Sequence, residues 1–256
     1  MVAPDVRFRR LAEQVADDLR RRILAGELAD GSVLPTEDQL LIEFPISKPS
    51  LREAIRILEA EGLLSVRRGK LGGSVVHRPS AANVAYTMGL VLGAHDVSLG
   101  DVGTALRQME PSCAALCAQR DDRNEVVVPV LRQIHDESVA SVTDLVLVTA
   151  ASRRFHEALV AHCGNETMII LAGALETLWS AHELSWSRQF TDHTSIPVEE
   201  RRTVLEDHSA LIDAIEAGNA QRARELAAEH LLDAQHYPGS AGAVDPAMVR
   251  TRTRTS

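Results

Sequence analysis

Apolar residues recur every three or four positions along most of the chain, which is the spacing that places them on one face of a helix. Near the N-terminus this pattern predicts a helix from about Phe8 to Ala25, a short helix capped by Thr36 and a third helix capped by Ser47. Pro49 is compatible with the first turn of the third helix, and Gly62 ends that helix. The segments "LLSVRR" and "GSVVHR" then predict two short strands joined by a glycine-rich turn.

Helical spacing resumes after a short linker and continues almost to the C-terminus. The predicted helices of this part span 82–93, 98–119, 122–139, 142–162, 166–190, 197–217 and 219–236. The last residues are poor in apolar side chains, which predicts disorder. We therefore expect a mainly α protein with four parts: a winged helix-turn-helix DNA-binding domain (1–78), a linker (79–83), an all-α effector-binding and dimerisation bundle (84–237) and a disordered tail (238–256).

The composition is that of an ordinary globular protein, with 45% apolar, 25% charged and only 3% aromatic residues. A core with so few aromatic residues must be aliphatic, which favours packed helices. No apolar run approaches the roughly 18 residues of a membrane span, and the N-terminal stretch lacks the apolar segment of a signal peptide. We expect a cytoplasmic protein without membrane contact, in which Cys113, Cys117 and Cys163 are buried free thiols.

Charge is distributed unevenly between the two predicted domains. The chain carries a net charge of −9, of which residues 1–80 contribute +1 and residues 81–256 contribute −10. Within the first part, Lys48, Arg52 and Arg56 stand four residues apart on the third predicted helix, and "SVRRGK" follows it. A basic helix alone is often only a solvated surface. Together with a basic wing, it predicts a surface that binds the DNA backbone and enters the major groove.

At these positions the chain resembles the GntR family of bacterial transcription regulators, in its FadR-like branch. The N-terminal similarity lies in "LPTEDQL", "SKPSLREAIRILEAEGLL" and "VRRGKLGG", within residues 10–78. The C-terminal similarity lies in "RQMEPSCAALCA", "RRFHEALVAHCGN" and "DHSALIDAIEAGNAQRARELAAEHL", within residues 84–236. The resemblance implies an all-helical FCD-type effector domain and a homodimer. It also implies a repressor that a small anionic metabolite releases from a pseudo-palindromic DNA operator.

The same resemblance assigns DNA reading to six residues on the third helix and the wing: Lys48, Ser50, Arg52, Arg68, Gly69 and Lys70. Lys48 stands where the family usually has arginine, and its compact ammonium matches the guanine edge less well than the planar guanidinium of arginine. Asp38 stands where many members have a DNA-contacting arginine. A carboxylate repels phosphate, so we expect no DNA contact from Asp38.

Three histidines lie on apolar helical stripes of the predicted bundle. His156 shares its stripe with Phe155 and Leu159, His208 precedes Leu211 and Ile212, and His230 follows Leu226 and Ala227. One such histidine is usually a core residue bonded to a neighbour. Three of them on three helices of one bundle predict a shared site, since neutral imidazoles from facing helices are common metal ligands.

The resemblance implies that these histidines hold a divalent metal such as zinc or nickel, with a fourth ligand one helical turn before the first. That fourth position is Ser152 here, a weak substitute for the usual Asp or Asn. The three histidines can then bind a metal with an open position for a ligand carboxylate, or bind an anionic ligand directly without metal. In the family an arginine at the position of Arg107 often reaches the ligand. The alternative is an i,i+3 pair between Arg107 and Glu110. Arg107 and Ser152 are therefore ligand-binding candidates.

Two other functions are alternatives to DNA binding that is controlled by a metabolite at a metal site. A metal-free sensor of acyl-coenzyme A or fatty acids is favoured by the missing acid at Ser152. A metal-dependent hydrolase is the other alternative, because three histidines and an open position can activate water. The sequence lacks a general base placed as in H-E-x-x-H, and an enzyme would have no use for the DNA-binding half. We expect no enzymatic activity.

Overall fold

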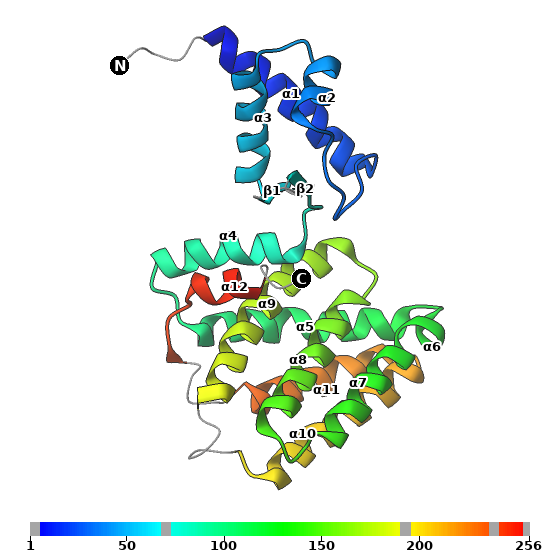
Figure 1. Cartoon of the computed structure of the whole chain (residues 1–256). Coiled ribbons are helices and arrows are strands. Elements are labelled where there is room, and N and C mark those ends of the chain that lie inside the picture. Colours follow the sequence, from blue (N-terminus) through cyan, green and yellow to red (C-terminus); the bar gives the residue numbers. More distant parts are fainter. Residues whose placement is uncertain (1–5, 68–72, 190–195, 236–240, 253–256) are drawn as a thin grey trace. The chain divides into compact units, whose positions relative to one another are not determined.

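The structure is a computed structural model, and it describes residues 6–67, 73–189, 196–235 and 241–252. The chain forms two compact units, Met1–Ser80 and Ala81–Ser256, so the division falls within the predicted linker. Figure 1 shows three helices and a small hairpin in the first unit and a helical bundle in the second. The predicted fold class is confirmed. No helix in the described part of the chain is long and apolar enough to span a bilayer.

The first unit is a winged helix-turn-helix. Its helices are α1 (Val6–Ala25), α2 (Glu37–Glu43) and α3 (Lys48–Ala60), and the wing consists of strands β1 (Leu64–Arg67) and β2 (Gly73–Val76). The strands pair antiparallel, with Leu64 opposite Val76 and Arg67 opposite Gly73. An aliphatic cluster joins all five elements and includes Leu19, Leu40, Leu51, Leu58, Leu64 and Val76.

Capping residues set the ends of α2 and α3, as the sequence predicts. Thr36 and Gln39 form a complete capping box at the start of α2. Ser47 caps α3 by accepting a hydrogen bond from the backbone N–H of Ser50. Gly62 follows α3 with a φ of 76°, a conformation that favours glycine, and so turns the chain into β1. These caps fix where α3 begins, and with it the position of its basic residues.

The second unit is all-helical. Its elements are α4 (Ala81–Ala94), α5 (Leu99–Gln119), α6 (Arg123–Val126), α7 (Val128–Ala140), α8 (Leu145–Ala161), α9 (Glu166–Gln189), α10 (Val198–Glu216), α11 (Ala220–Ala234) and α12 (Pro246–Arg252). The predicted helix 122–139 is in fact two, because Pro129 in the first turn of α7 has no N–H for a continuous helix. Helices α5, α7, α8, α10 and α11 enclose a core that contains Phe155, Leu159, Leu211 and Ile215.

The C-terminal segment differs from the sequence prediction. We expected residues 238–256 to be disordered, yet 241–252 fold against the bundle and include α12. Val244 and Val249 are buried in a cluster with Leu178 and Trp179 of α9. The backbone N–H of Asp245 donates to Nε2 of His182 at 2.8 Å. The two buried valines and the hydrogen bond to His182 hold this segment against α9.

Candidate functional site

Helix α3 presents two of the predicted DNA-reading residues to solvent. The side chains of Lys48 and Arg52 are 57% and 64% exposed. Both lie on α3, the helix that begins at the Ser47 cap. The three wing candidates, Arg68, Gly69 and Lys70, lie outside the described residues. Among the described residues, the exposed part of the predicted DNA surface is therefore the basic edge of α3, formed by Lys48 and Arg52.

Acidic residues of α2 bind this basic edge. Arg52 donates through Nε to Oε2 of Glu37 at 3.0 Å and through Nη2 to Oε1 at 3.3 Å. Lys48 donates to Oδ1 of Asp38 at 3.4 Å. The hydrogen bond from Arg52 lowers the pKa of Glu37, so this carboxylate stays ionised. Asp38 contributes by contacting Lys48, a role that the sequence did not indicate.

Ser50 does not belong to this exposed edge, contrary to the expectation. Its side chain is buried, and its Oγ lies 2.9 Å from Oγ of Ser47. Ser50 is near the start of α3, where its backbone N–H already bonds to the capping Ser47. It supports the helix start and does not present a hydroxyl to a base.

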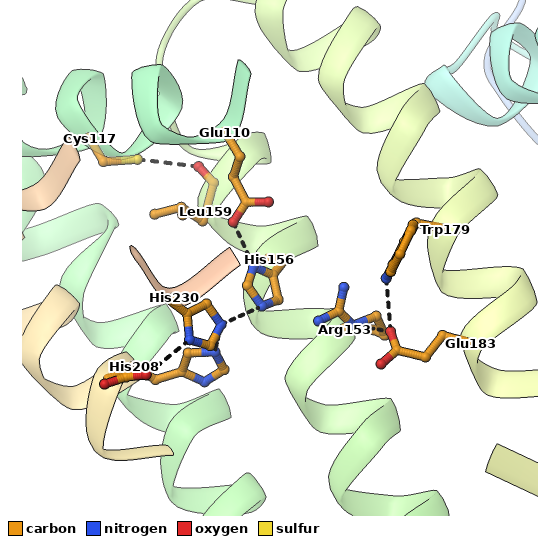
Figure 2. A network of polar contacts seen from close by, with 10 residues as sticks. Glu110, Cys117, Arg153, His156, Leu159, Trp179, Glu183, His208 and His230 are labelled. Atoms are coloured by element: carbon orange, nitrogen blue, oxygen red, sulfur yellow. Dashed lines mark hydrogen bonds and ion pairs between the residues drawn. The ribbon is translucent and has the colours of Figure 1, made fainter. Parts of the chain in front are cut away.

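The three candidate histidines meet inside the bundle. His156 comes from α8, His208 from α10 and His230 from α11, and all three are almost completely buried. Nε2 of His230 lies 3.1 Å from Nε2 of His208 and 3.3 Å from Nε2 of His156 (Figure 2). The predicted convergence of these side chains is thus present, and we call the group the histidine triad.

The spacing of the triad suits a shared metal ion better than mutual hydrogen bonds. Two nitrogens bound to one tetrahedral zinc at about 2.0–2.1 Å would lie roughly 3.3–3.4 Å apart. A single Nε2 has only one hydrogen or one lone pair in the ring plane, so Nε2 of His230 cannot satisfy two imidazoles at once. One ligand atom from each residue lies within 4.8 Å of the others. The residues present could therefore hold a metal ion.

A carboxylate hydrogen-bonded to His156 orients one ring of the triad, and a second carboxylate lies near His230 without a hydrogen bond. Oε1 of Glu110 on α5 lies 2.5 Å from Nδ1 of His156, and Oδ2 of Asp207 lies 3.5 Å from Nδ1 of His230. A carboxylate at Nδ1 favours the tautomer whose Nε2 is free to bind a metal. His208 instead stacks on Phe155, with the ring centres 4.0 Å apart. Sequence reasoning missed Glu110 and Asp207 as members of the site.

Burial determines the protonation of this region. It lowers the pKa of His156 and His208 well below the ordinary value, so both are neutral, as metal ligation requires. Burial also raises the pKa of Glu110 and of Glu176, which lies close to it on α9. One positive residue, Arg153, is buried with these carboxylic acids. The raised pKa values favour the neutral form of both acids, and the positive charge of Arg153 opposes that shift.

A cavity of about 330 Å³ is lined largely by residues of α8 and α10, the helices that carry His156 and His208, although no histidine of the triad lines it. Ser152, one helical turn before His156, lines it as the sequence suggests, and so does Asp207, which contacts His230. Aliphatic side chains form much of the remaining wall: Leu145, Val148, Ile196, Val204 and Leu205. The cavity can enclose a small molecule, and Asp207 links its wall to His230.

Arg107 makes contacts other than the expected pair with Glu110. It is not among the residues that line the cavity, and it does not pair with Glu110, whose carboxylate contacts His156. Its guanidinium donates to Oε1 of Gln235 at 2.5 Å and to Oγ1 of Thr104 at 2.8 Å. Glu110 is buried on the inner side of α5, whereas the charged end of Arg107 reaches towards the end of α11.

A winged helix-turn-helix joined to a helical bundle that contains a cavity is the arrangement of ligand-responsive DNA-binding regulators. The family model "Bacterial regulatory proteins, gntR family" matches residues 11–72, and the model "FCD domain" matches residues 101–233. The chain belongs to the GntR family, with a C-terminal FCD domain.

Relatives and solved structures agree with this class. A protein of Escherichia coli K12 described as an L-lactate dehydrogenase operon regulator is 31% identical over 87% of this chain and 84% of its own length. The transcriptional repressor NanR of Salmonella newport is 25% identical over 87% and 83%. A GntR structure from Streptococcus agalactiae has a TM-score of 0.65 and 22% identity over 88% of this chain and 98% of its own, which supports the fold. These relatives are regulators and not enzymes, as the sequence predicts.

Proposed function

We propose that the protein is a repressor that binds a pseudo-palindromic operator as a homodimer and leaves it when a small anionic metabolite occupies the cavity. The convergence of three imidazole nitrogens, two of them from helices that also line that cavity, is the observation that carries the proposal. Buried polar atoms need partners, and a divalent metal would supply one to all three Nε2 atoms at once. His156, His208 and His230 would hold the metal, zinc or nickel by the preference of imidazole ligands.

The bound metal would supply a positive centre for an anion. Neutral imidazole ligands would leave the double positive charge of the ion unreduced. Ser152 adds no charge at the cavity wall. An anionic metabolite is thus a better partner for this site than a neutral one.

The size of the cavity favours a small ligand over the alternative of an acyl-coenzyme A. Ligand pockets commonly range from about 300 to 1,000 Å³, and this one lies near the lower limit. A nucleotide-containing thioester needs much more space. A metal-free mode, in which the histidines donate directly to the anion, remains the second candidate because position 152 is a serine.

DNA binding would use the exposed edge of α3, with Arg52 reading a base and Lys48 contacting the duplex. One winged helix covers a short half-site, so two copies on a pseudo-palindrome would provide the needed specificity. Static light scattering at micromolar concentration should give the mass of a dimer, with and without DNA. A monomeric mass in both samples would contradict this part of the proposal.

A DNA sequence selected in vitro can take the place of the natural operator in a test of this function. Selection from a random duplex pool would yield the preferred sequence, and fluorescence anisotropy would then follow its release. L-lactate is a suitable first probe, because it is a small carboxylate and one relative is described as regulating an L-lactate dehydrogenase operon. Pyruvate, glucuronate and N-acetylneuraminate extend the panel. Release by at least one acid, at concentrations that leave a non-specific duplex unaffected, would support the proposal. DNA binding that no small anion changes would contradict it.

A further inference from the structure

Arg153 is a buried cationic residue in the wall of the cavity. Its side chain is 2% exposed, whereas the adjacent Arg154 is 50% exposed and donates to Glu137 on α7 at 2.6 Å. Neighbouring positions on a helix point about 100° apart, so α8 can turn only one of the two arginines inward. The sequence alone does not decide between them.

The partners of Arg153 leave part of its guanidinium unused. Nε lies 2.8 Å from Oε2 of Glu183, and this oxygen also accepts a hydrogen bond from Nε1 of Trp179 at 3.0 Å. In the view of Figure 2 the guanidinium lies between His156 and Glu183. Its Nη1 is buried and has no hydrogen-bond partner among the described residues. A buried guanidinium nitrogen without an acceptor is unfavourable, because the water that solvated it has been lost without replacement.

The other arginine of the cavity wall is already satisfied at two nitrogens. Arg201 donates through Nε to the carbonyl oxygen of Ile196 at 2.8 Å and through Nη1 to that of Val142 at 3.0 Å. Those bonds tie Arg201 to two backbone carbonyls from separate segments and indicate a structural role. Arg153 therefore differs from Arg201 in having a buried donor available beside the cavity.

We propose that Arg153 is the residue that binds the carboxylate of the metabolite, and that the ligand is a compact monocarboxylate. The inference rests on the proposed function, in which this cavity is the effector site. Arginine suits a carboxylate because its planar N–H groups match the two oxygens. The aliphatic side chains of the wall surround the body of the ligand, and the hydroxyls of Thr149, Ser152 and Thr203 are available to its polar substituents.

The location of Arg153 also suggests how the ligand is sensed. Glu183 forms an ion pair with Arg153 and accepts a hydrogen bond from Trp179, so a carboxylate that draws the guanidinium into the cavity alters the environment of the Trp179 indole. The chain has two tryptophans, Trp179 and Trp186, both on α9. Intrinsic fluorescence is therefore a local report on this cavity, independent of DNA binding.

The test is a fluorescence titration of the full-length protein with acids and their neutral amides. L-lactate, pyruvate and acetate are compared with lactamide, pyruvamide and acetamide, each in zinc-containing buffer and again in chelator. The variants are Arg153→Gln, Arg153→Lys as a form that keeps the buried charge, and Arg154→Gln as the matched exposed control. We expect Arg153→Gln and Arg153→Lys to weaken acid binding by roughly 10–100-fold and to leave amide binding unchanged. Arg154→Gln should behave as wild type.

The outcomes separate this inference from the proposed function. If Arg153→Gln unfolds in a circular-dichroism melt, Arg153→Lys decides the question. Acid binding that is unchanged in the folded Arg153 variants would overturn the role of Arg153 and leave the effector cavity intact. A wild-type protein that binds neither acids nor amides would overturn the proposed effector cavity, and this inference with it.

Discussion

Arg52 on α3 uses its Nε and Nη2 atoms to bind Glu37 on α2 in a two-point contact. The pair is exposed, so its contribution to folding is small. Its effect on orientation is larger, because two contacts fix the plane of the guanidinium. The other edge of the guanidinium, at Nη1, is left for a base. In the proposed DNA complex, Glu37 would therefore position the guanidinium of Arg52 before DNA binds.

Glu37→Gln is expected to bind DNA with less discrimination. Loss of the carboxylate removes a repulsive charge near phosphates and frees Arg52, so affinity for a random duplex should rise while preference for the selected sequence falls. Anisotropy titrations with both duplexes would measure the ratio of the affinity for the selected sequence to the affinity for the random duplex. Glu27→Gln is the control, since it removes the same charge from a residue that pairs with Arg21 on α1. An unchanged ratio in Glu37→Gln would show that Glu37 does not position Arg52.

Glu110→Ala should weaken metal binding although Glu110 is not a ligand in the triad. The change removes the carboxylate at Nδ1 of His156, and loss of such a partner typically lowers metal affinity about 10–100-fold. Competition with a fluorescent zinc chelator would measure the affinity. Glu137→Ala is a suitable control because Glu137 is exposed and pairs with Arg154. Equal affinities in the two variants would contradict the role of Glu110.

The cysteines should resist thiol reagents in the native state. All three are buried and free, as the sequence predicts. Burial raises the pKa of Cys117 to about 12 and also raises the pKa of Cys113, so almost no thiolate forms at these two positions even at pH 9. Reaction with Ellman's reagent should be slow at pH 7 and pH 9 and become complete after unfolding in guanidinium chloride. Rapid native reaction of two or more thiols would contradict this account.

The fold could be predicted from periodicity because most helices bury one continuous aliphatic stripe. The prediction was less accurate where small residues form the buried face of a helix or where only a few apolar residues mark a buried segment. In α1, Leu11 and Leu24 are more than one-third exposed and the small Ala12 and Ala16 occupy the core. In the C-terminal segment, Val244 and Val249 are too few to create a periodic signal, although both are buried.

The site was predictable only in part for a related reason. Each histidine of the triad lies on an apolar stripe, so its inward direction can be read from its own helix. The contacts of Glu110 with His156 and of Arg153 with Glu183 join different helices, and spacing along one chain segment does not encode them. An acidic residue at an inward position of α5 was the available signal for Glu110.

The most direct test of the central claim is the metal content of the purified protein. We expect about one zinc or nickel ion per chain by inductively coupled plasma mass spectrometry, after purification without chelator. His208→Ala should lose most of this metal and its DNA release by small acids. It should keep its affinity for the selected duplex, because the triad lies outside the winged helix. A wild-type protein that contains no metal, gains none on addition of zinc and still leaves DNA in response to an acid would contradict the metal-based account.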